Sequence, residues 1–262
     1  MKLDIEPVLK IAVEAGRAIM SVYEDEQAFS AVTFKEDSSP LTLADTLSHN
    51  IIAKGLISLH PDIPVLSEEG SDIEYELRKN WEYYWCVDPL DGTREFINRN
   101  GEFTVNIALI HRNMPVLGVI YVPCKDLLYY ADASGSFKQI PQKEPLPIKA
   151  DLHAQAWIAL GSRSHSDASE SDFLSAYPVT ELLSAGSSLK FCLIAEGKAH
   201  IYYRKGPTME WDTAAGHAIA LASGAMFTNP DGTPFLYNKP SLRNGSFVCR
   251  TLAKPATDLK SA

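Results

Sequence analysis

Cysteine is scarce in this chain, and the few cysteines are not arranged in pairs. Four of them lie far apart among 262 residues, without a CxxC motif: Cys86, Cys124, Cys192 and Cys249. Three fall in apolar or strand-like runs. The pattern therefore predicts buried free thiols rather than a disulfide framework or a cysteine zinc site. It favours a reduced, cytoplasmic setting.

Long apolar runs and an excess of positive charge are also lacking. No stretch approaches the roughly 20 apolar residues of a membrane-spanning helix, and residues 1–6 contain no signal-peptide core. The 24 Lys and Arg residues are outnumbered by 33 Asp and Glu residues, for a net charge of -9. We expect no transmembrane segment and no nucleic-acid partner, because nucleic acids bind basic surfaces. An acidic protein can still bind an anionic ligand where a metal ion or a local basic pocket dominates the field.

Helix-like and strand-like patterns alternate along the chain. Apolar residues at three- and four-residue spacing predict helices over residues 4–23 and 42–59. Three apolar runs, at residues 103–111, 116–122 and 127–131, predict an antiparallel meander. Further helices are predicted at residues 172–177, 189–196 and 213–222, and further strands at 65–67, 156–160 and 199–203. The predicted fold class is mixed α and β in layers.

A polar, proline-rich segment at residues 140–147 is the best candidate for a boundary between two lobes. It predicts an N-terminal lobe over residues 1–145 and a C-terminal lobe over residues 146–262. The chain is long enough for each lobe to have a core of its own.

Two aspartates three residues apart, Asp88 and Asp91, carry the strongest chemical signal. The apolar run at residues 84–87 predicts a buried strand, which Pro89 ends because proline cannot donate to the strand ladder. Both carboxylates then leave one strand end together, with the Leu90 carbonyl between them. Hard divalent cations favour such an oxygen cluster. On its own, however, the fragment is more often an ordinary loop than a metal site.

Other polar side chains stand at predicted strand ends or helix starts. Asp212 precedes the helix at 213–222, where it can cap the helix, ligate a metal or do both. Residues 186–190 open another helix, either as an anion cradle or, more commonly, as a serine cap beside a solvated lysine. Asp45 lies in a first helical turn, where an acidic residue is usually a surface charge. His165 lies in a polar loop after a strand, a frequent place for α/β ligand sites.

These elements together match one family. DPxDGTxxF is present at residues 88–96 and WDxAAG at residues 211–216, with Glu68 and Glu69 upstream. Over nearly its whole length, the chain resembles the lithium-sensitive, magnesium-dependent phosphatases that include inositol monophosphatase and fructose-1,6-bisphosphatase. Residues 98–110, 161–165 and 186–192 are most similar to the bacterial CysQ-type 3'(2'),5'-bisphosphate nucleotidases, although Arg94 replaces a lysine. The resemblance implies a layered αβαβα sandwich of two lobes, the sugar-phosphatase fold, with the site between them.

The resemblance also implies which residues hold magnesium. Glu68, Asp88 and the Leu90 carbonyl would hold one Mg²⁺, and Asp88, Asp91 and Asp212 would hold a second. Two or three ions per site are implied. Oxygen ligands of this kind suit octahedral Mg²⁺ completed by water and phosphate. The ions would polarise the phosphoryl group and stabilise the leaving oxygen.

Water activation and substrate contacts are implied for residues around these ligands. Thr93, with Asp45 or Glu69, would orient or deprotonate the attacking water, and which of the two carboxylates is the principal base stays open. Substrate contacts are implied for Glu68, Leu90, Asp91, Gly92, Thr93, His165, Gly186, Ser187, Ser188, Lys190 and Asp212.

The implied activity is removal of the 3'-phosphate from adenosine 3',5'-bisphosphate to leave AMP, in sulfur assimilation, with the 5'-phosphosulfate analogue of that nucleotide as a further substrate. An inositol monophosphatase is the first rival, favoured if Lys190 points away from the metal pocket. A non-catalytic module on the same scaffold would predict a lost metal ligand or a lost Thr93, and the sequence has lost neither. Peripheral association with the inner membrane, and the choice between monomer and homodimer, stay open.

Overall fold

A computed structural model describes residues 3–25, 33–34, 40–41, 43–70, 72–162 and 168–251. The helices are α1 (Glu6–Glu24), α3 (Leu43–Leu59), α4 (Tyr75–Arg78), α5 (Thr93–Ile97), α6 (Ala168–Leu174), α7 (Leu189–Ala195) and α8 (Glu210–Ala222), with short 3-10 turns η1 (Glu68–Gly70) and η2 (Pro123–Lys125). The strands are β1 (Thr33–Phe34), β2 (Pro40–Leu41), β3 (Val65–Ser67), β4 (Tyr83–Asp91), β5 (Thr104–His111), β6 (Met114–Val122), β7 (Leu127–Asp132), β8 (Gly135–Gln139), β9 (Leu146–Pro147), β10 (Trp157–Ser162), β11 (Val179–Ala185), β12 (Ile201–Arg204), β13 (Thr208–Met209), β14 (Met226–Thr228), β15 (Arg243–Asn244) and β16 (Phe247–Arg250).

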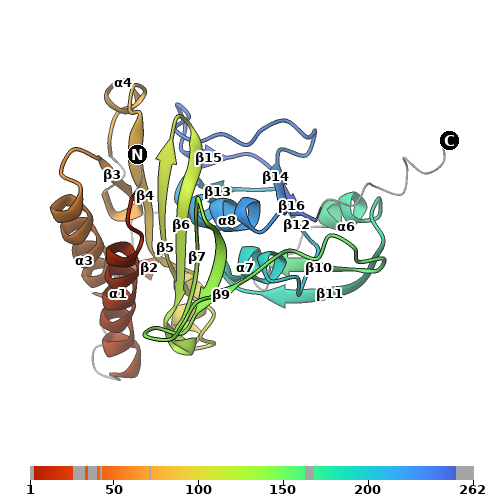
Figure 1. Cartoon of the computed structure of the whole chain (residues 1–262), viewed down its shortest axis with the longest axis horizontal. Coiled ribbons are helices and arrows are strands. Elements are labelled where there is room, and N and C mark those ends of the chain that lie inside the picture. The colour runs from red at the N-terminus through yellow and green to blue at the C-terminus, as the bar shows by residue number, and fades with distance from the viewer. Residues whose placement is uncertain are drawn as a thin grey trace.

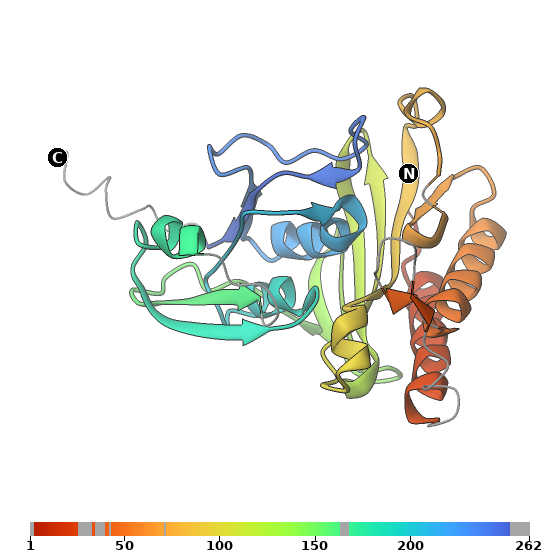
Figure 2. The same cartoon turned by 180° about the vertical axis from the view of Figure 1, so that it is seen from behind.

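Helices and sheets alternate in five layers (Figures 1 and 2). In the described ranges, one sheet has the strand order β3-β4-β5-β6-β7-β8-β9 and a second has the order β11-β10-β12-β16-β14. Helices α1 and α3 cover one face of the first sheet, and α7 and α8 fill the space between the two sheets. Helix α6 packs on the outer face of the second sheet. The predicted αβαβα layering is therefore confirmed.

The outer layer forms because α1 and α3 each present an apolar stripe to the first sheet. Val8, Ala12 and Ile19 recur at helical spacing in α1 and are fully buried, as are Ile52 and Leu56 in α3. They pack against one face of the meander, whose other face is left for α8. Each residue buried in this way removes apolar surface from water, worth about 1.5–3 kcal/mol for a large aliphatic side chain.

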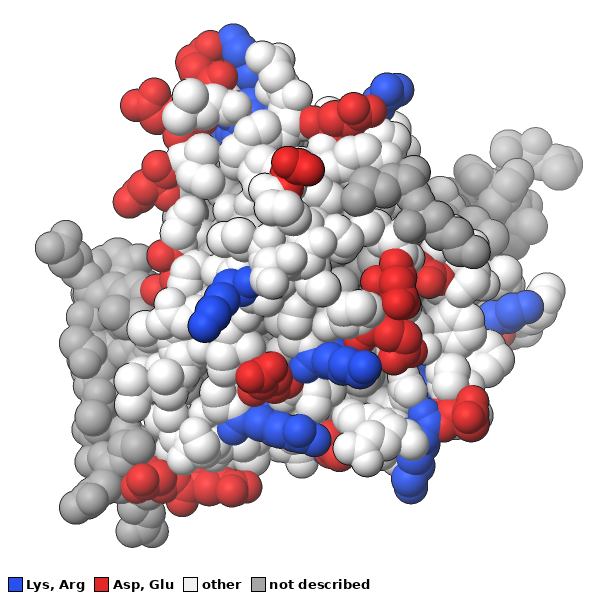
Figure 3. Space-filling model, turned by 60° about the vertical axis from the view of Figure 1, so that its left-hand side comes forward, with Lys and Arg blue, Asp and Glu red and all other residues white. Residues whose placement is uncertain are grey.

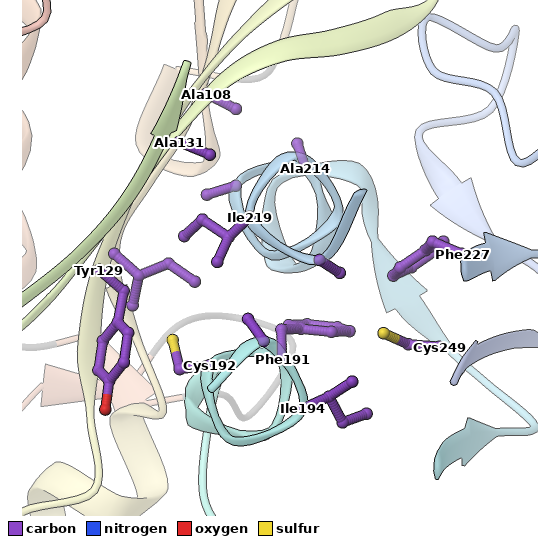
Figure 4. Packing of buried hydrophobic residues seen from close by; sticks show 14 of the residues in the cluster. Ala108, Tyr129, Ala131, Phe191, Cys192, Ile194, Ala214, Ile219, Phe227 and Cys249 are labelled. Carbon is purple, nitrogen blue, oxygen red and sulfur yellow. The ribbon is translucent and has the colours of Figure 1, made fainter. Parts of the chain in front are cut away.

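Helix α8 can lie directly on the first sheet because both surfaces are small at the contact. It presents Ala214, Ala215 and Ala218 to the sheet, and a Cβ atom at Gly118 of β6 would overlap the Ala215 carbonyl oxygen. Figure 4 shows α8 and α7 between the sheet residues Ala108 and Ala131 and the opposite layer. This close approach holds the beginning of α8 at the end of β4, where the candidate site lies.

The largest core crosses the predicted lobe boundary. It joins residues of β4 to β7 with residues of α7, α8, β12 and β16. Strand β9, which begins at Leu146, pairs with β8 of the first sheet. The segments before and after this boundary therefore share one apolar core. The division into lobes between residues 145 and 146 stays a prediction.

Several sequence-based boundaries were wrong. Pro89 does not end its strand: β4 continues to Asp91, and its pairing with β5 shifts between Asp88 and Asp91, where the proline has no N–H to donate. Helix α8 begins at Glu210, so Asp212 is the third residue of the helix and not the residue before it. Helix α6 lies earlier than the predicted 172–177, and β11 was not predicted. In the described part of the chain, none of the helices is both long and apolar enough to cross a membrane.

Candidate active site

The pairing of β3 with β4 brings two acidic segments together. The strands run parallel, and Ser67 pairs with Val87. Ser67 is followed by Glu68, the first residue of η1, and Val87 is followed by Asp88 within β4, so the two carboxylates lie at the same end of the paired strands. The end of β3 at Ser67 was predicted, whereas β4 continues past the predicted end at Val87, and the parallel register explains why residues 20 positions apart meet.

Helix α3 brings a further carboxylate to the same place. The Ser48 hydroxyl donates a 2.7 Å hydrogen bond to the Pro89 carbonyl, which anchors the helix to the turn between the two aspartates. Asp45 lies three residues earlier on the same helical face and is buried, with 2% of its surface exposed. Its position in the first turn therefore does not make it a surface charge, contrary to the usual pattern for such residues.

These carboxylates form one electrostatic cluster around Asp88. Burial raises the pKa of Asp88 well above its usual range, and nearby negative charges raise it further. Those charges belong to Glu68, Asp91, Asp212 and Asp45. Burial and the Asp91 charge also raise the pKa of Asp212. The five carboxylates that the sequence nominated at four separate places thus converge on one region.

The turn after Asp88 is held by its own hydrogen bonds. The Leu90 amide donates a hydrogen bond to Asp88 Oδ1 at 3.1 Å, and the Thr93 hydroxyl donates a long one, at 3.4 Å, to the Leu90 carbonyl oxygen. Gly92 has a φ of 90°, a left-handed conformation that favours glycine. Helix α5 begins at Thr93 immediately after it. The turn therefore places the Thr93 hydroxyl next to the Leu90 carbonyl, directly after Asp88 in the chain.

Asp91 and Asp212 are each fixed by donors. Asp91 Oδ2 accepts from the hydroxyls of Ser187 and Ser188, both at 2.7 Å. Asp212 Oδ2 accepts from the Met209 amide at 2.9 Å, so its carboxylate caps the first turn of α8 from within the helix. Asp212 is thus a capping residue, as predicted, but it lies inside the helix and not before it. The other carboxylate oxygen of Asp212 does not take part in this bond.

The donor set fits a hard divalent cation in its chemistry. It consists of carboxylate and carbonyl oxygens that repel one another without a counter-charge, which is the environment that Mg²⁺ prefers. Among the described residues, no three His, Cys, Asp or Glu side chains converge closely enough to hold a metal ion as they stand. The metal roles of Glu68, Asp88, Leu90, Asp91 and Asp212, and the role of Glu69 in the turn η1, therefore stay predictions.

A cavity of about 170 Å³ opens beside the acidic cluster. The acidic residues Asp91, Glu95 and Asp212 line it, together with the cations Arg94, Lys190 and Arg204. On the molecular face in Figure 3, by contrast, positive and negative side chains are interspersed. The cavity therefore combines the acidic edge of the first sheet with a local concentration of cations.

Lys190 is a buried cation with most of its donors engaged. Its ammonium group donates to the carbonyl oxygens of Ala185 at 3.0 Å and Ser187 at 2.8 Å, and it lies over the ring of Tyr202. An ammonium group has three N–H donors, and these two carbonyl oxygens accept from two of them. Burial lowers the pKa of Lys190 to about 8. Residues 186–190 do open a helix, as predicted, because Ser188 is at the N-cap of α7, but the Ser188 side chain makes no capping hydrogen bond and the lysine is buried and not solvated.

Arg204 is a cation of the cavity that the sequence did not indicate. It ends β12, which pairs with β10 in parallel and with β16 in antiparallel fashion. A single arginine after an apolar strand carries no motif, and only the sheet pairing places it beside Lys190. The predicted substrate residue His165 lies outside the described residues.

Comparison with known proteins decides the family. The model of the inositol monophosphatase family matches residues 4–258. The chain belongs to the inositol monophosphatase family. It is 48% identical over 224 residues to the 3'(2'),5'-bisphosphate nucleotidase CysQ of Salmonella typhimurium, covering 84% of this chain and 88% of that protein. It is 45% identical over 247 residues to the protein of the same name from Escherichia coli K12, covering 93% and 98%.

Solved structures of the inositol monophosphatase family share the fold. The crystal structure of CysQ from Bacteroides thetaiotaomicron matches with a TM-score of 0.82 and 40% identity, covering 95% of this chain and 97% of that one. The suppressor protein suhB from Bartonella henselae matches with a TM-score of 0.77 at 22% identity, a likeness of fold alone. The resemblance stated from the motifs, and the narrower similarity to the nucleotidases, are confirmed.

Proposed function

We propose that this chain is a Mg²⁺-dependent phosphomonoesterase that removes the 3'-phosphate of adenosine 3',5'-bisphosphate and leaves AMP. The observation that carries the proposal is one cavity lined both by the acidic residues Asp91 and Asp212 and by the cations Lys190 and Arg204. The names of the similar proteins from Salmonella typhimurium and Escherichia coli support the same activity.

A substrate with two phosphates suits this arrangement. The acidic side would hold Mg²⁺ through Glu68, Asp88, the Leu90 carbonyl, Asp91 and Asp212. The ions would supply charge stabilisation to the reacting phosphoryl oxygens and to the leaving oxygen. The second phosphate does not react, and carries negative charge that needs a separate partner. Lys190 and Arg204 offer that partner in the same cavity, as a point charge and a planar fork of donors.

The chain's own residues would handle the proton. The Thr93 hydroxyl lies on the rigid turn beside the Leu90 carbonyl and would orient the attacking water. Asp45 or Glu69 would accept the water's proton as its oxygen bonds to phosphorus and the bond from phosphorus to the 3'-oxygen breaks. Asp45 is buried next to Asp88, which supports its part in this step.

The position of Lys190 favours the nucleotidase over an inositol monophosphatase. An inositol monophosphate has no second phosphate, so a lysine directed away from the acidic side would suit it better. Lys190 instead lines the same cavity as Asp91 and Asp212. The assignment to a bisphosphate substrate rests on this shared cavity.

The proposal is tested by phosphate release across a substrate panel. The panel compares adenosine 3',5'-bisphosphate, its 5'-phosphosulfate analogue, 3'-AMP and inositol 1-phosphate, each with Mg²⁺ and with excess chelator. We expect the highest kcat/KM for the bisphosphate and no turnover in chelator. Li⁺ should inhibit, because it resembles Mg²⁺ in size but carries half the charge and stabilises the leaving oxygen poorly. Undiminished activity in chelator, or a preference for inositol 1-phosphate, would overturn the proposal.

A further inference from the structure

A buried chain of polar groups runs from the first sheet to the Asp91 carboxylate. The Thr104 hydroxyl donates to Asn106 Oδ1 at 2.9 Å, and Asn106 Nδ2 donates to the Ser188 hydroxyl oxygen at 2.9 Å. Ser188 in turn donates to Asp91 Oδ2 at 2.7 Å. Because Thr104 occupies Asn106 Oδ1, the amide of Asn106 is oriented with its nitrogen toward Ser188 and Asp91. The Asp91 carboxylate can only accept, which sets the same orientation of the amide, while the Thr104 hydroxyl also lies 2.6 Å from the Ser187 hydroxyl, where either oxygen can be the donor.

The hydroxyl of Ser188 stands where two predicted metal ligands meet. Besides Asp91 Oδ2, it lies 3.0 Å from the backbone carbonyl oxygen of Asp212. Ser188 and Asn106 are each 1% exposed, and neither lines the cavity, whereas Ser187 does. Their polar groups are thus directed to the aspartates and not to the space where substrate would bind.

The bonds to Asp91 all end on one oxygen. Ser187 and Ser188 donate to Oδ2 at 2.7 Å, and Asn106 Nδ2 lies 3.3 Å from the same atom. A carboxylate held in this way cannot rotate freely, and its Oδ1 is directed away from these donors. Groups that hold a metal-ligating carboxylate by hydrogen bonds commonly set the affinity of the metal site.

We propose that Ser188 and Asn106 are positioning residues that orient Asp91 and the start of α8 for the second metal ion. The inference rests on the proposed function, since it takes Asp91 and Asp212 as metal ligands. It assigns the Ser188 hydroxyl to the carboxylate in place of the substrate contact that the family resemblance implies. Loss of the hydroxyl should weaken metal binding while leaving the substrate site intact.

The test is direct titration of the substrate-free enzyme with Mn²⁺, followed by electron paramagnetic resonance. Ser188→Ala and Ser188→Cys remove the hydroxyl, and the cysteine variant does so at nearly unchanged side-chain volume. Ser188→Thr keeps the hydroxyl. We expect the first two variants to weaken one class of Mn²⁺ site by roughly 10- to 100-fold, and the threonine variant to recover most of that loss. Asn106→Ala should weaken the same class.

Steady-state kinetics separate positioning from substrate contact. In Ser188→Cys, the Mg²⁺ concentration for half-maximal activity should rise, while the KM for substrate at saturating Mg²⁺ stays near that of the wild type. Wild-type Mn²⁺ affinity in Ser188→Cys, or a raised substrate KM with unchanged metal affinity, would overturn the inference. Absence of Mn²⁺ binding by the wild-type enzyme would instead contradict the proposed function itself.

Discussion

The ammonium nitrogen of Lys190 lies 2.8 Å from the carbonyl oxygen of Ser187, to which it donates a hydrogen bond. The same loop therefore carries its own buried cation, whose pKa burial lowers to about 8. The charged groups of Asp91, Arg204, Glu95 and Glu102 act on this lysine as well. A cation with such a pKa loses its charge just above neutral pH, and this gives the first prediction.

The preference for a bisphosphate substrate should decline as pH rises through about 8. The neutral amine no longer attracts the non-reacting phosphate, and the charged fraction of Lys190 falls to about one tenth one pH unit above its pKa. The ratio of kcat/KM for adenosine 3',5'-bisphosphate to that for 3'-AMP, measured from pH 7 to 9, reports this loss, because effects on the chemical step cancel in the ratio. A ratio that stays constant over this range would exclude Lys190 from phosphate selection.

A variant of Lys190 without the charge is the matched control for the pH experiment. Lys190→Met keeps the apolar stem and removes the charge, so bisphosphate binding should weaken by about 1–3 kcal/mol, the scale of a lost charge-assisted hydrogen bond. Binding of 3'-AMP should change much less, and the pH dependence of the ratio should disappear. An equal loss for both substrates would mean that the lysine serves the loop alone.

Removal of the central carboxylate should separate stability from turnover. Asp88→Asn replaces a buried acid whose pKa is raised by burial and by neighbouring carboxylates. We expect turnover to be almost abolished, while the variant melts at the same or a higher temperature than the wild type in chelator, because a repelling charge is gone. Addition of Mg²⁺ should raise the wild-type melting temperature but not that of the variant. Wild-type turnover in Asp88→Asn at matched Mg²⁺ would remove this residue from the site.

The acidic half of the site could be predicted from sequence because its signals are local. Glu68 and Asp88 directly follow short apolar runs, and parallel pairing of those runs then brings the two residues together. The burial of Asp45 could not be predicted, since it depends on the hydrogen bond from Ser48 to the distant Pro89 carbonyl. A first-turn acid on an otherwise ordinary helix carries no sign of that contact.

The cationic half depends on tertiary pairing, and sequence analysis found it only in part. Strand β11 was missed because Thr180 to Ser184 are exposed, so its sequence lacks the apolar alternation of a half-buried strand. Arg204 was missed because its place beside Lys190 follows from the pairing of β12 with β10 and β16. The Ser187–Ser188 pair was predicted as a substrate contact, while its bonds to Asp91 emerge only when the β11–α7 loop is placed against β4.

A methyl group on Gly118 should disturb the contact that positions α8. A Cβ atom there would overlap the carbonyl oxygen of Ala215 and approach the Ala218 side chain to 2.8 Å. Gly118→Ala should therefore lower the free energy of unfolding by about 1–3 kcal/mol, and reduce activity by shifting Asp212. Urea unfolding measures the first effect. Gly245→Ala is the control, because no heavy atom lies within 4 Å of a Cβ at that position; a comparable loss in both variants would contradict the packing argument.

His217 should make the fold sensitive to mild acid. Its ring is fully buried, stacks on Phe227 with ring centroids 4.2 Å apart, and has Nδ1 3.1 Å from the Tyr237 hydroxyl. Burial lowers its pKa to about 3, against about 6.5 in an unfolded chain. Below about pH 6.5 the unfolded chain therefore binds a proton that the folded protein does not. The stabilisation is complete above that pH and is lost as the pH falls toward 3.

Comparison with a non-titrating variant isolates this contribution from that of the carboxylates. Between pH 7 and 4.5, the free energy of unfolding of the wild type should fall by roughly 2–3 kcal/mol more than that of His217→Gln. The glutamine amide retains a partner for the Tyr237 hydroxyl but does not ionise. Urea unfolding of both proteins at each pH, in chelator so that metal binding does not contribute, measures the difference. An equal loss of stability in the two proteins would mean that His217 binds its proton in the folded protein as readily as in the unfolded chain, and would contradict this prediction.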